Sequence, residues 1–118
     1  MLNANEMRRL STTIDEAMAE LDKEEGKLST AKDSRDVARK EAVAAQQEFA
    51  AALEKFPIDQ IPNAISGRFL VALDASAIAE KALAATAAKV THTKKKFINA
   101  MDAFAAIVKA QAVKRPSL

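Results

Sequence analysis

Apolar and small residues recur at alternating intervals of four and three along the first half of this 118-residue chain, from Leu10 to Phe56. This spacing is typical of a helix that forms a coiled-coil seam, and it predicts a helix over about residues 5–56. One row of the seam consists mostly of large residues: Ile14, Leu21, Leu28, Arg35, Ala42, Phe49 and Phe56. The other row consists mostly of small ones: Leu10, Ala17, Glu24, Ala31, Ala38, Ala45 and Ala52.

The stretch EKFPIDQIPNAISG, residues 54–67, separates this helix from the second half of the chain. Pro57 ends the first helix, because a proline disfavours the helical conformation of the residue before it. We therefore predict a turn at 57–61 and a second helix over about residues 62–113. A dedicated binding loop is the less economical interpretation, since both prolines of the stretch already have structural roles.

The second helix can begin in two ways. Pro62 fits a first helical turn, where its missing N–H leaves no hydrogen bond unmade, and Asp59 is then the N-cap. Alternatively, residues 59–65 form a short turn of their own, and Ser66 caps the long helix.

The alternating spacing resumes in the second helix. One row reads Phe69, Ser76, Leu83, Val90, Phe97 and Phe104. The other row reads Leu73, Glu80, Ala87, Lys94, Met101 and Val108. Because a short connection makes the two helices antiparallel neighbours, facing residues should have numbers that add up to about 118. This register brings together Phe49 with Phe69, Glu24 with Lys94, and Arg35 with Glu80. A register shifted by one heptad is the alternative.

These patterns predict an all-α fold, in which residues 1–118 form a single helical domain. The domain is an antiparallel two-helix hairpin or coiled coil, completed to a four-helix bundle by dimerisation or by a partner. The composition agrees, because hydrophobic residues make up 49% of the chain but aromatic residues only 4%. An alternative is that a helix breaks, for example at Gly26, and folds back into a three- or four-helix bundle.

Few residues suggest chemistry. The chain has no cysteine and one histidine, His92, so a metal site is not expected. No set of residues has the spacing of a catalytic site, and two glycines cannot form a phosphate-binding loop. We expect no enzyme activity, no cofactor and no small-molecule substrate. We also expect a soluble cytoplasmic protein, because neither a signal peptide nor an apolar run of membrane-spanning length is present.

Two basic groups are candidates for binding anions. The run THTKKKF, residues 91–97, faces the acidic residues of LDKEE in the proposed register, so most of its charge should be neutralised within the chain. The other group is a tip formed by the two termini, which predicts an alternative function as a salt-sensitive binder of nucleic acid or anionic surfaces. Its residues are Arg8, Arg9, Lys109, Lys114 and Arg115.

Apolar residues outside the seams are the most informative functional feature, because contiguous exposed apolar patches mark contact surfaces. We predict that Leu70, Ile78, Ile98 and Ile107 bind a partner, either another protein or a second copy in a homodimer. The function would be a protein–protein interaction module that acts by scaffolding, bridging or steric blocking. In size, alanine content and lack of catalytic residues, the chain resembles small helical accessory proteins of phages and of assembly machines.

Overall fold

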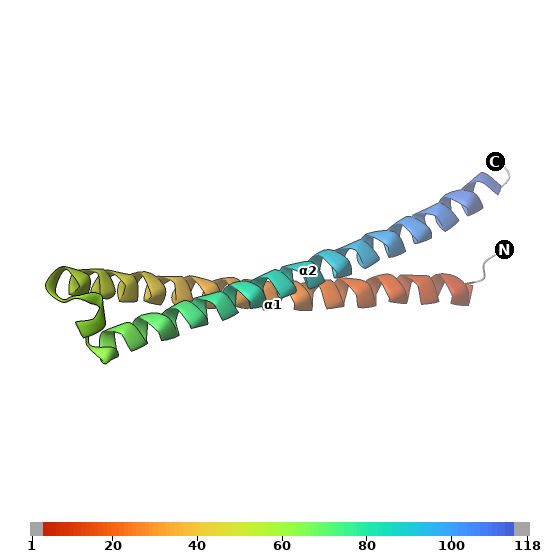
Figure 1. Cartoon of the computed structure of the whole chain (residues 1–118). Helices are drawn as coiled ribbons and strands as arrows, with labels where there is room; N and C mark the ends of the chain where they lie inside the picture. The colour runs from red at the N-terminus through yellow and green to blue at the C-terminus, as the bar shows by residue number, and fades with distance from the viewer. Residues whose placement is uncertain (1–3, 115–118) are drawn as a thin grey trace. The chain divides into compact units, whose positions relative to one another are not determined.

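The computed structural model describes residues 4–114, and the side chains of residues 4–112. Two long α-helices, α1 (Ala4–Lys55) and α2 (Asn63–Lys114), are joined through a short 3₁₀ turn, η1 (Ile58–Gln60) (Figure 1). No strand occurs within residues 4–114. The prediction of an all-α fold with two long helices is confirmed.

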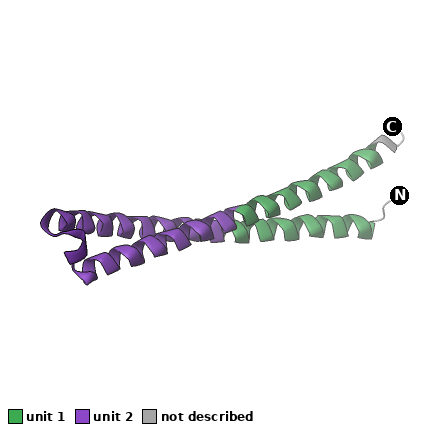
Figure 2. Ribbon diagram, viewed as in Figure 1, with its two compact units in different colours: residues 1–26, 88–118 green, residues 27–87 purple. Residues whose placement is uncertain are grey.

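The two helices pair in two stretches, which we describe separately (Figure 2). Unit 1 combines residues 1–26 with residues 88–118, and unit 2 is the continuous stretch 27–87. In unit 2 the helices are antiparallel and connected by the turn, which makes it a helical hairpin. In unit 1 the helices are also antiparallel, and the N- and C-terminal ends lie at the same end of the pair. That the whole chain is a single domain stays a prediction.

Helix α1 continues through Gly26 without a break, so the alternative of a first helix that folds back on itself is wrong. The residues around Gly26 include Leu, Lys and Glu, which favour helix enough to carry one glycine.

Replacing Gly26 with alanine is expected to raise the free energy of unfolding by about 1 kcal/mol. A Cβ added here meets no atom within 4 Å, and the backbone φ is not positive, so the methyl group fits without strain. Urea unfolding followed by circular dichroism measures the change. The reverse substitution at the exposed Ala19 should lower the stability by a similar amount. A loss of stability in Gly26→Ala would contradict an uninterrupted helix at this position.

The seam of α1 matches its prediction from Leu10 to Ala52. Each residue of the two predicted rows in this range is buried or half-buried, and the residues between them are exposed. Leu21, Ala38 and Ala52 are among the most buried apolar side chains. The alternating spacing therefore identified which face of α1 packs.

The turn removes Phe56 from the seam. The sequence predicts that this residue ends the large row, but α1 ends at Lys55 and the Phe56 side chain is 42% exposed. Pro57 redirects the chain into η1, where the amide of Gln60 donates to the carbonyl of Pro57 at 2.9 Å. Ile61 follows, and its side chain is only 7% exposed.

Helix α2 begins after Pro62, whose carbonyl accepts the amide of Ile65 at 3.0 Å. Ser66 does not cap the helix, because it lies inside the first turns and its hydroxyl donates to the carbonyls of Pro62 and Asn63. The alternative with a Ser66 cap is therefore wrong.

One row of the α2 seam differs from its prediction by one residue. The row beginning at Phe69 is half-buried as expected. The second row consists instead of Ala72, Ala79 and Thr86 in unit 2 and of Thr93, Ala100 and Ile107 in unit 1. The predicted members Leu73, Met101 and Val108 are exposed. Burying a charged side chain costs more than exposing an apolar one. The shift keeps Lys94 of the predicted row exposed, whereas Glu80 and Ala87 of that row remain half-buried.

Three contacts fix the register of unit 2. The rings of Phe49 and Phe69 lie 5.0 Å apart between centroids, which confirms that predicted pair. Arg39 forms an ion pair with Glu80 at 2.5 Å, and Arg68 forms one with Glu48. The residue numbers of each pair add up to values close to the predicted sum, so the antiparallel register holds in this unit.

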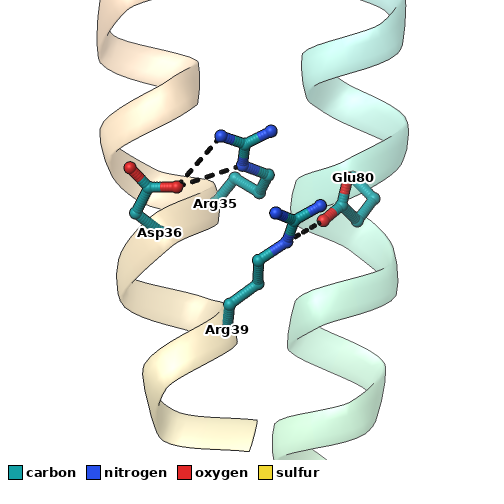
Figure 3. A network of polar contacts seen from close by, with 4 residues as sticks. All are labelled: Arg35, Asp36, Arg39 and Glu80. Atoms are coloured by element: carbon teal, nitrogen blue, oxygen red, sulfur yellow. Dashed lines mark hydrogen bonds and ion pairs between the residues drawn. The ribbon is translucent and has the colours of Figure 1, made fainter.

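Arg35 does not reach Glu80 as predicted. Its guanidinium instead forms an ion pair with Asp36 at 3.0 Å, and Arg39, one turn further along, contacts Glu80 (Figure 3). Arg39 lies beside the seam and close to Glu80, whereas Arg35 occupies a half-buried seam position. The edge position reaches the carboxylate without burying the charge, which explains the exchange.

Unit 1 also contains an ion pair that differs from the prediction. Glu24 is 3% exposed and contacts Lys89 at 3.5 Å, whereas the register pairs it with Lys94. Thr93 is buried in this region and Lys94 is exposed, as the one-residue shift of the second row requires. Lys89 approaches the carboxylate from the edge of the pair, and its side chain stays 58% exposed.

Candidate interaction surfaces

The first flank of unit 2 is an exposed apolar strip on the side where Arg39 pairs with Glu80 (Figure 3). Residues spaced three, four or seven apart share one side of a helix, and Arg39 and Glu80 therefore identify the neighbouring positions. Leu70 is the most exposed large residue here at 66%, and Leu73 is 45% exposed. The strip consists of Val43, Ala50, Leu53, Leu70, Leu73 and Ala77.

The second flank of unit 2 lies on the other side of the seam, where Arg68 pairs with Glu48. Val71 is 70% exposed and Ile78 is 60% exposed on this side. A shallow hollow of 450 Å³ lies along it, lined by Glu41, Gly67, Arg68, Val71, Ala72 and Ala75. The strip consists of Val37, Ala44, Ala51, Val71, Ala75 and Ile78. Unit 2 therefore has two apolar sides, separated by its own seam.

The four residues predicted to bind a partner do not share one face. Leu70 lies on the first flank and Ile78 on the second. Ile98 is 42% exposed in unit 1. Ile107 is half-buried in the shifted row of the unit 1 seam, so its predicted position outside the seam is wrong. The same one-residue shift that buries Ile107 exposes Val108 next to it.

Sequence reasoning missed several exposed apolar residues. The one-residue shift of the second row explains two of them, Leu73 and Met101. Leu73 and Met101 were assigned to the seam, yet they lie beside it and are exposed. Ile58 in the turn is 74% exposed and was not singled out. The charge of Lys94 in the predicted row is the signal that could have identified the shift.

The lysine run is not neutralised within the chain as the sequence predicts. Lys94, Lys95 and Lys96 are exposed, and none of them forms an ion pair within the part of the chain that the structure describes. The shifted row explains part of this result, because it places Lys94 beside the seam instead of in it.

The predicted anion-binding tip can be followed only in part. Arg8, Arg9 and Lys109 are exposed in unit 1. The side chain of Lys114 and the whole of Arg115 lie outside the described residues. His92 is exposed, and no group of three metal-binding side chains is found among residues 4–112. No helix in the described range is apolar enough over a sufficient length to cross a membrane.

Comparisons with protein-family models, with curated proteins and with solved structures find no match to this chain. The proposed function therefore rests on the exposed surfaces of the chain.

Proposed function

We propose that this chain is a non-enzymatic protein–protein interaction module, in which unit 2 presents its two flanks to helices of other protein chains. It acts by scaffolding, bridging or steric blocking. The observation that carries the proposal is the exposure of large apolar side chains on both sides of one helical pair.

The energetics favour association over an isolated hairpin. No side chain among the described residues is less than 2% exposed, so the seam alone supplies a thin core. Burying a fully exposed Leu, Ile or Val side chain contributes about 1.5–3 kcal/mol. Each flank carries several such side chains at 44–70% exposure, and a helix packed against it would cover them.

The arrangement favours bridging in particular. The two flanks are on opposite sides of the seam, so one helix can occupy each of them without displacing the other. Completing a pair of helices with further helices is the common route from a hairpin to a bundle. The ion pairs Arg39–Glu80 and Arg68–Glu48 lie beside the flanks, and the residues of the flanks themselves are all apolar.

Photo-crosslinking tests this function in the cells that make the protein. A photoreactive residue at position 70 reports on the first flank, and one at position 78 reports on the second. Lys81 is a matched exposed control on the outer ridge of α2, between the two flanks. We expect adducts that contain a second protein chain from positions 70 and 78, and few from position 81. Equal yields from all three positions would contradict specific docking on the flanks.

A further inference from the structure

The two helices of unit 1 carry opposite charges. Residues 1–26 contain seven acidic and three basic side chains, whereas residues 88–118 contain seven basic and one acidic side chain. The ion pair between Glu24 and Lys89 uses one charge from each helix. Asp22 and Glu25 on α1 and Lys94 on α2 are exposed and form no ion pair in the described part of the structure.

These unpaired charges lie on one side of unit 1. Glu25 is two heptads before Arg39, and Lys94 is two heptads after Glu80, so each has the same place beside the seam as its counterpart. Arg39 and Glu80 contact each other across one side of unit 2. Glu25 and Lys94 therefore border the equivalent side of unit 1.

Apolar residues accompany the charges on this side. On α1 the sequence of positions is Asp15, Met18, Asp22 and Glu25, with intervals of three, four and three. On α2 it is Lys94, Ile98 and Met101, with intervals of four and three. Met18, Ile98 and Met101 are 39–44% exposed. We call this surface, made of these seven residues, the Met18 side.

We propose that the Met18 side of unit 1 binds the same side of a second copy of the chain. A twofold axis parallel to the helices places α1 of one copy against α2 of the other, so each contact occurs twice. Asp22 and Glu25 of one copy then face Lys94 of the second copy, and Met18 of one copy faces Ile98 and Met101 of the second. This interface goes beyond the proposed function, because it uses a surface separate from the two flanks.

The charges favour a second copy as the occupant. A strip with acids on one helix and a base on the other is complementary to itself after a twofold rotation. In this dimer every helix also has antiparallel neighbours, an arrangement found in up-down four-helix bundles and favourable for helix dipoles. A polyanion such as nucleic acid would match Lys94 but be repelled by Asp22 and Glu25.

A charge-exchange experiment tests the dimer. The basic side is reversed in Lys94→Glu, and the acidic side is reversed in Asp22→Lys/Glu25→Lys. Each variant alone should dimerise at least ~100-fold more weakly than the wild type, because like charges now face each other. Mixed in equal amounts, the two variants should form a heterodimer, since each reversed helix meets an opposite charge. Light scattering at low salt measures the mass, and circular dichroism checks the helicity.

Controls and outcomes separate this dimer from attraction within one chain. Lys96→Glu and Glu20→Lys reverse charges of the same signs on the other side of the two helices. Both variants should dimerise like the wild type. Where a reversal lowers helicity, Lys94→Gln and Glu25→Gln replace it and should weaken the dimer by a smaller factor.

Four results would overturn the proposal: a monomeric wild type, unaltered dimers in the reversed variants, no recovery on mixing, or Lys94-dependent binding of short duplex DNA with no change in mass. Loss of flank crosslinking with an intact unit 1 dimer would instead count against the proposed function alone.

Discussion

Replacing Ala52 with aspartate is expected to destabilise unit 2 by about 3–5 kcal/mol, the range for leaving an unpaired charge in a buried position. Ala52 is 5% exposed in the small row of the α1 seam, beside the turn. Because this position is buried, a carboxylate there loses its hydrating water. Urea unfolding followed by circular dichroism gives the change in free energy.

Ala51 provides a matched control for this substitution. It is adjacent in the chain and exposed, and it lies in the same last turns of α1. Ala51→Asp therefore carries the same unfavourable interaction with the helix C-terminus but no burial. We expect it to cost less than about 1 kcal/mol. Equal costs at the two positions would contradict the seam as described.

Replacing Phe49 or Phe69 with alanine is the second large effect that we expect, at about 3 kcal/mol for each. The two rings lie 5.0 Å apart with a 34° tilt between their planes, and both are half-buried. A double-mutant cycle should give a coupling of about 0.5–1.5 kcal/mol, the range for aromatic pairs. Phe56→Ala is the control, because that ring is 42% exposed and outside the seam. A coupling near zero between Phe49 and Phe69 would contradict their contact.

Much of the fold could be predicted because α1 has an unambiguous pattern. Its apolar and small positions have only one consistent alternation, and the two charged members, Glu24 and Arg35, interrupt it without shifting it. Pro57 fixes the end of the helix through its effect on the preceding residue. The phenylalanine pair then follows from the length of the turn.

The second row of α2 could not be predicted in the same way. Alanine occurs on almost every side of this helix, so two neighbouring rows are both compatible with a seam. Large residues favour the row with Leu73 and Met101, whereas the cost of burying Lys94 favours the row with Ala72 and Ala100. The structure follows the charges. This balance depends on packing against α1, which periodicity alone does not describe.

The ambiguity between the two rows of α2 also affects the prediction of the candidate surfaces. Leu70 and Ile78 were identified as exposed because they lie outside both possible rows. Leu73 and Met101 were missed, and Ile107 was misplaced, because their exposure depends on which row packs. The charged side of unit 1 could not be predicted from the sequence, because the predicted register neutralises the lysine run, whereas the structure exposes it.

The mass of the unmodified chain in solution tests most directly the claim that this protein works by association of helices. Light scattering over a range of concentrations and salt is sufficient. At low salt we expect twice the 12.7 kDa of one chain, with a shift towards a single chain as salt screens the acidic and basic strips. A mass of 12.7 kDa at every concentration and every salt condition would contradict the proposed dimer.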